Sequence, residues 1–153
     1  MKNSKRPFIW LPTRDEGLRR LETFLAPAGR DYARLRNFDN GPGRHVHVST
    51  LSPWIRDRLL PESEVFSAVL KRHSFQAAEK FIQEVFWRTY WKGWLELRPG
   101  VWQRYQSDLE QLMDRFECND EFQNRFSRAT SGETGIQCFD EWANELTRHG
   151  TLF

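Results

Sequence analysis

One stretch of the chain, residues 81–91, combines side chains that could bind a flat, polar aromatic ligand. On a helix, four of them share one face at spacings of three and four: Glu84, Trp87, Arg88 and Trp91. There the indoles could stack on a ring, the carboxylate could accept N–H hydrogen bonds and the guanidinium could hold an anion. The same spacing also fits a surface ion pair between Glu84 and Arg88 beside a buried aromatic stripe, and periodicity leaves both interpretations open.

A second candidate is the loop at residues 41–53, which combines glycines, a basic residue, hydroxyl side chains and a helix start. Free backbone amides at a helix start, with hydroxyls beside them, can hold a phosphate. The alternative is an ordinary capped helix after a loop. His45 and His47 also lie in this loop, but no third ligand is near them in the sequence, so we predict no metal site.

A third, weaker candidate is the segment 132–135, Gly-Glu-Thr-Gly, ahead of Asp140 and Trp142. It also fits a simple turn followed by a helix cap. The two cysteines, Cys118 and Cys138, fit no metal-binding spacing, and we expect them to be reduced thiols.

The elements that must position these residues are predicted to be helical, because helical periodicity is interrupted by Gly/Pro loops and few segments alternate as strands do. We therefore predict an all-α, multi-helix array. Ser52-Pro53 is a favourable helix start, because serine can cap free amides and proline suits the first turn. The predicted helices cover about 15–25, 31–36, 52–59, 62–71, 75–97, 101–116, 120–128 and 136–148.

Length and composition limit the function class. The 153 residues suffice for one domain, and no run approaches the roughly 20 apolar residues of a membrane helix. The basic N-terminus lacks the apolar segment of a secretory signal, so we expect a cytoplasmic protein without a membrane partner. The net charge of +2 does not decide for or against a nucleic-acid partner. Arginine is much more frequent than lysine, which suits phosphate binding but also fits ordinary surface charge.

Three segments, taken in order, resemble the FAD-binding helical domain of the DNA photolyase/cryptochrome family. In that family a tyrosine precedes a Thr/Ser-Ser-x-Leu-Ser-Pro loop, and in this chain Tyr32 precedes Val-Ser-Thr-Leu-Ser-Pro at 48–53. The family helix Trp-x-x-Glu-Leu-x-Trp-Arg-Glu-Phe is matched by Phe-Ile-Gln-Glu-Val-Phe-Trp-Arg-Thr-Tyr at 81–90. The family turn Gly-x-Thr-Gly-Tyr-Pro-x-Val-Asp-Ala is matched by Gly-Glu-Thr-Gly-Ile-Gln-Cys-Phe-Asp-Glu at 132–141. The similarity predicts an extension at 1–12 and the first part of such a domain at 13–153.

The resemblance implies a role for each matched residue. Those that would hold the phosphates and ribitol of FAD are Tyr32, Ser49, Thr50, Leu51 and Ser52. Arg88 would lie at the flavin, and Arg36 would meet the DNA backbone. Glu84 and Trp87 would face the pyrimidine dimer as catalytic residues. The implied activity is that of a flavoprotein carbon–carbon lyase, which repairs pyrimidine dimers in DNA with light.

Several features depart from the family pattern. Val48 removes one hydroxyl from the phosphate loop, and Phe81 stands in place of a tryptophan. The family continues with a His-Asn-x-x-Arg-Met segment and carries an antenna domain upstream, and the sequence contains neither. We therefore expect the chain to be incomplete for catalysis alone. The alternative is a non-catalytic helical module that binds a partner protein or DNA, or that self-associates through a face left exposed by truncation.

Overall fold

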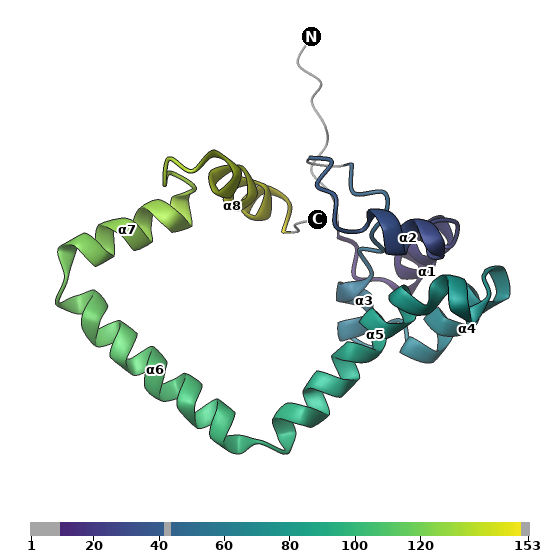
Figure 1. Ribbon diagram of the computed structural model, residues 1–153, viewed down its shortest axis with the longest axis horizontal. Helices are drawn as coiled ribbons and strands as arrows, with labels where there is room; N and C mark the ends of the chain where they lie inside the picture. Colours follow the sequence, from purple (N-terminus) through teal and green to yellow (C-terminus); the bar gives the residue numbers. More distant parts are fainter. Residues whose placement is uncertain (1–9, 42–43, 151–153) are drawn as a thin grey trace, which may run out of the picture. The chain divides into compact units, whose positions relative to one another are not determined.

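The computed structural model describes residues 10–41 and 44–150, and all regular structure within these residues is helical (Figure 1). This confirms the all-α prediction. The helices are α1 (Arg14–Phe24), α2 (Arg30–Leu35), α3 (Ser52–Arg56), α4 (Glu62–Arg72), α5 (Phe75–Glu96), α6 (Pro99–Glu117), α7 (Asp120–Ser131) and α8 (Gln137–His149). Most of the predicted extension, and Pro42 and Gly43 of the candidate phosphate loop, lie outside the described residues. No helix in the described ranges is both long enough and apolar enough to cross a membrane.

The chain divides into two compact units, each with its own internal contacts. The N-terminal unit comprises the described residues up to Trp91, and the C-terminal unit comprises those from Lys92 onward. All buried hydrophobic residues of the described chain belong to the N-terminal unit: Leu21, Phe24, Leu25, Ala28, Tyr32, Leu51, Trp54, Ile55, Leu60, Val65, Val69, Ala78, Phe81, Ile82 and Val85. On α5 the buried residues recur at three- and four-residue spacing, which explains why this segment is helical and which face packs inward.

Trp54 of α3 is central to this core. Its side chain is 2% exposed, and its indole N–H donates to the Leu11 carbonyl at 3.1 Å. Helix α1 can pack against the indole only at Gly17, because a Cβ there would lie 2.8 Å from Trp54 Cδ1. Proline at the start of α3 and glycine in α1 thus set the position of one large aromatic side chain.

The start and end of α3 differ from the prediction. Ser52 is the first helical residue and makes no capping hydrogen bond, because Leu51 occupies the N-cap position. The helix ends at Arg56 rather than near residue 59, since Arg58 adopts a left-handed conformation with φ of 59°. Local propensity could not predict either difference, because both depend on the packing of Leu51 and Trp54 in the core.

The C-terminal unit is built from α6, α7 and α8, and neither α6 nor α7 contains a buried residue. The junction of α6 and α7 is aromatic: the Phe116 ring lies 5.3 Å from that of Phe126. Asn119 caps α7 by accepting from the amide of Phe122 at 2.8 Å. Pro99 lies between the predicted helices at 75–97 and 101–116, and it occupies the first turn of α6, where proline is well tolerated.

The Gly-Glu-Thr-Gly segment forms the turn between α7 and α8. The carboxylate of Asp140 accepts hydrogen bonds from the hydroxyl and amide of Thr134, at 2.6 and 2.8 Å, and from the amide of Gly135 at 2.9 Å. Gly132 takes a left-handed conformation at the end of α7, with φ of 65°. The structure therefore agrees with the turn interpretation of this segment, but Ile136 occupies the N-cap of α8 and makes no capping hydrogen bond.

The turn should make the stability of the C-terminal unit depend on pH. The hydrogen bond from the Thr134 hydroxyl, followed by those from the backbone amides, lowers the pKa of Asp140. A carboxyl whose folded pKa is depressed stabilises the fold above its unfolded pKa, about 3.9, and this contribution is lost as the pH falls through the folded pKa. Thermal unfolding followed by circular dichroism should show Asp140→Asn to be less stable than the natural chain at pH 7, with the difference shrinking below about pH 4. Equal stability of the two proteins at every pH would contradict this role of Asp140.

Candidate functional site

Three of the predicted site residues meet where α2 and α5 pack together. Arg36, which caps the end of α2, donates through Nη1 to Oε1 of Glu84 on α5. The Arg36 guanidinium also lies over the Tyr32 ring, 5.5 Å from its centroid. The interpretation of Glu84 as the partner of Arg88 is therefore wrong: the carboxylate pairs with an arginine 48 residues earlier in the chain. Sequence spacing could not reveal this pair, because it depends on the packing of two helices.

Tyr32 lies in the core rather than on an open surface. Its ring is 8% exposed and packs edge-on against Phe81 at 5.2 Å and Phe24 at 5.9 Å. Burial raises the pKa of Tyr32, which keeps the phenol neutral near pH 7, although the hydrogen bond with Arg36 acts in the opposite direction. The hydrogen bond with Glu84 raises the pKa of Arg36. Nε of Arg36 is buried and has no hydrogen-bond partner among the described residues.

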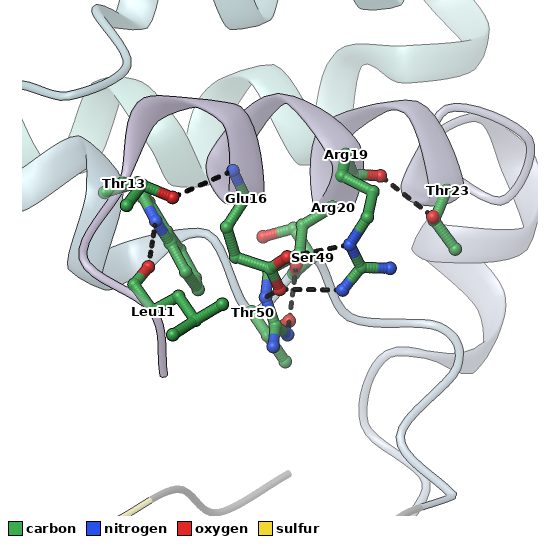
Figure 2. A network of polar contacts seen from close by, with 9 residues as sticks. Leu11, Thr13, Glu16, Arg19, Arg20, Thr23, Ser49 and Thr50 are labelled. Carbon is green, nitrogen blue, oxygen red and sulfur yellow. Dashed lines mark hydrogen bonds and ion pairs between the residues drawn. The ribbon is translucent and has the colours of Figure 1, made fainter. Parts of the chain in front are cut away.

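The hydroxyl loop before α3 forms a second cluster (Figure 2). Thr50 takes a left-handed conformation with φ of 51°, and its hydroxyl donates to the Ser49 carbonyl at 2.7 Å and accepts from Nη1 of Arg20 at 3.4 Å. The Ser49 hydroxyl accepts from the Leu51 amide at 3.4 Å. Leu51 itself is fully buried in the core, whereas Ser52 is exposed. The hydroxyls of this loop therefore bond to its own backbone, and that of Thr50 also accepts from Arg20 of α1.

Arg20 was missed by the sequence reasoning. Its guanidinium lies over two indoles, 4.8 Å from the Trp54 ring and 5.0 Å from the Trp10 ring, and it pairs with Glu16 at 2.9 Å. Desolvation lowers the pKa of Arg20, but an arginine remains charged under all ordinary conditions. The four-residue spacing of Glu16 and Arg20 was the only sequence signal for this pair. Arg20 donates a hydrogen bond to the hydroxyl of Thr50, which is one of the predicted phosphate-loop residues.

The predicted ligand face of α5 is open to solvent. Its four members, Glu84, Trp87, Arg88 and Trp91, are all exposed, whereas Ala78, Phe81, Ile82 and Val85 are the buried residues of α5. The Trp87 and Trp91 rings lie 6.0 Å apart, and the Tyr90 and Trp91 rings 5.4 Å apart. The interpretation of these tryptophans as a buried aromatic stripe is therefore wrong, and the indoles are accessible to a stacking ligand.

The predicted residues thus form two separate groups in the N-terminal unit. Among the described residues, no hydrogen bond or ring contact links the hydroxyl loop to Tyr32 or to Arg88. A groove of about 510 Å³ lies between α1 and α4, and a cavity of about 50 Å³ lies beneath Trp10. None of the nine predicted site residues lines either space. The FAD-binding and DNA-binding roles of these residues stay predictions.

Two further findings concern metal ions and similarity to known proteins. In the parts of the chain that the structure describes, no group of three metal-ligating side chains could hold a metal ion, and Cys118 and Cys138 are free and exposed. Comparison of the chain with family models, with curated proteins and with solved structures gives no significant match.

Proposed function

We propose that this chain is part of a photolyase-like FAD-binding domain, related to light-driven repair of pyrimidine dimers in DNA and not sufficient for catalysis by itself. The single observation that carries the proposal is the contact between Arg36 and Glu84 beside Tyr32. It joins the first and second segments of the family resemblance, although they are far apart in the sequence. A residue implied to hold FAD, one implied to meet the DNA backbone and one implied to face the dimer are thereby neighbours.

The residues of this chain fit part of a flavin site. The exposed Arg88 supplies a cation on the α5 face, and the Arg36 guanidinium, whose side chain is 25% exposed, supplies a second at the end of α2. The loop hydroxyls of Ser49 and Thr50 would contribute on the phosphate side, where Arg20 lies close by. Val48 lacks one hydroxyl of the family loop, which should weaken phosphate binding by about 0.5–1.5 kcal/mol without abolishing it.

When bound and reduced, FAD would supply an electron on absorbing blue light, and this electron would open the dimer and then return. The residues of the chain would bind and orient. Glu84 would accept a hydrogen bond from the dimer, and Trp87 would stack on a flipped base. Both side chains are exposed on α5, as access by an extruded nucleotide requires.

The exposed apolar surface of the C-terminal unit supports the proposal that this chain needs further parts for catalysis. On α6, α7 and α8, aromatic and aliphatic side chains are exposed in number, among them Trp102, Tyr105, Phe126, Phe139 and Trp142. Surfaces of this kind normally mark an interface. The same observation favours the second candidate function, a helical module that binds a partner through these side chains.

Flavin binding decides between the two functions. Purified protein should be yellow, or should take up added FAD, with the visible absorption of an oxidised flavin. Arg88→Ala should weaken FAD binding about tenfold or more, the effect of losing one charge-assisted hydrogen bond. Arg56→Ala is the matched control, because Arg56 is exposed on α3 and is not one of the predicted residues. Equal losses in the two variants, or a protein that binds no FAD at all, would refute the proposal and leave the helical module.

A further inference from the structure

Helix α6 carries an exposed apolar seam. Its members alternate at spacings of three and four residues: Trp102, Tyr105, Leu109, Leu112 and Phe116. This is the heptad spacing with which one helix packs along another. The exposed fractions of the first four are 60%, 54%, 44% and 48%, and Phe116 is half-buried against α7.

Apart from Val101 and Met113, which are also exposed, the side chains of α6 outside the seam are mostly polar. Positions roughly opposite the seam carry Arg104, Ser107, Gln111 and Asp114, as expected for a helix with one packing face. The helix contains no buried residue, so the seam has no cover within the C-terminal unit comparable to a core. Two charged residues, Asp108 and Arg115, flank the seam on the same side, one heptad apart.

We propose that this seam binds the same seam of a second copy of the chain, with the two α6 helices antiparallel. In an antiparallel pair centred between Leu109 and Leu112, each of these leucines faces the other leucine of the second copy, and Tyr105 faces Phe116. The same register sets Asp108 of each copy beside Arg115 of the other. The symmetric pair therefore contains two opposite-charge contacts at the edge of an apolar seam.

Charge also argues against the other arrangements. Sliding the antiparallel pair by one heptad would bring Asp108 of one copy beside Asp108 of the other, which is repulsive. A parallel pair would set Asp108 beside Met113 of the second copy, so that the carboxylate would gain no partner. Of these three arrangements, only the first places both charged residues beside an opposite charge. Arg115 also lies over the Phe122 ring of α7, 4.7 Å from its centroid, so the second contact adds to one that the guanidinium already makes.

The size of the seam predicts a weak dimer. Aromatic side chains carry on the order of 150–250 Å² each, and about half of this is exposed at Tyr105. Trp102 would face residue 119 of the second copy, beyond the end of α6, and adds little to the seam. With the leucines, the two copies together would remove less than about 1,000 Å² from water, the size of weak, transient interfaces. We therefore expect association in the micromolar range, on the order of what small interfaces achieve.

Sedimentation velocity over a range of protein concentrations tests the proposal, with helicity recorded for every protein. The average mass should rise from 18.3 kDa toward twice that value. Asp108→Arg should weaken association by about tenfold or more, because both opposite-charge contacts become repulsive. The double variant Asp108→Arg/Arg115→Asp should recover association, since the charges are exchanged across the same interface. Recovery of this kind separates a defined pair from non-specific aggregation.

Leucine replacement gives a second test. Leu109→Glu should abolish association in the same concentration range, because it would bury two carboxylates in the seam. Gln111→Glu introduces the same residue on the opposite side of α6 and should leave association unchanged. A natural chain that stays monomeric at all concentrations, a double variant that does not recover, or equal effects of Leu109→Glu and Gln111→Glu would overturn the proposal. The inference does not rest on flavin binding, which would be measured separately through the N-terminal unit.

Discussion

Replacing Trp54 by alanine is expected to lower the free energy of unfolding of the N-terminal unit by about 3–5 kcal/mol, as large-to-small changes of buried aromatic residues do. The indole is 2% exposed, contacts α1 at Gly17 and donates to the Leu11 carbonyl. It also supports the Arg20 guanidinium at 4.8 Å. The truncation therefore leaves a cavity, a carbonyl without its donor and a cation without one of its two aromatic faces.

Urea unfolding followed by circular dichroism measures this effect, and Trp87→Ala is the matched control. Trp87 is 54% exposed on α5, so the same substitution there should cost only about 0.5 kcal/mol. Similar losses in the two variants would mean that Trp54 is not the anchor of this core. Since small domains are stable by only about 5–15 kcal/mol, the expected loss at Trp54 is a large share of the total.

Phe81→Ala is expected to lower the free energy of unfolding by about 3–5 kcal/mol as well. This second large effect also changes the candidate site. The Phe81 ring is 2% exposed and lies 5.2 Å from the Tyr32 ring and 4.9 Å from the Phe24 ring. Removing it opens a cavity directly beside Tyr32, which carries the Arg36 guanidinium on its face. We expect the Arg36–Glu84 contact to loosen as well as the core.

Phe75→Ala controls for the general cost of a phenylalanine-to-alanine change on this helix. Phe75 is the first residue of α5 and is 61% exposed, so its replacement should change the free energy of unfolding by about 0.5 kcal/mol or less. Phe81→Leu should retain part of the stability that Phe81→Ala loses, because a leucine refills part of the volume. A small effect of Phe81→Ala would contradict the role of the Phe24–Tyr32–Phe81 cluster.

The helical prediction for α5 succeeded because its information is local. Ala78, Phe81, Ile82 and Val85 recur at the period of a helix, and Pro99 follows shortly after its end. The same period identified Glu84 and Arg88 as neighbours on one face. It could not say whether that face lies in the core or in solvent, since aromatic residues are common in both settings.

The interpretation that pairs Glu84 with Arg88 was wrong, because local spacing does not show which other helix packs nearby. Local spacing predicts Arg88, four residues away, as the partner of Glu84, whereas in the structure the partner is Arg36 at the end of α2. Exposed pairs at four-residue spacing contribute only a few tenths of a kcal/mol, so a better-placed cation from α2 can displace them. The position of Arg20 over Trp54 and Trp10 is likewise a consequence of packing α1 against α3.

Local patterns in the sequence predicted the all-helical class, the approximate helices and the turn before α8, because helical period, proline and glycine are properties of neighbouring residues. Tertiary packing buries Tyr32 and Leu51 in a core, pairs Glu84 with Arg36 and leaves the tryptophans of α5 exposed to solvent. These outcomes depend on which helix covers which face, a long-range competition for apolar surface that local patterns do not encode.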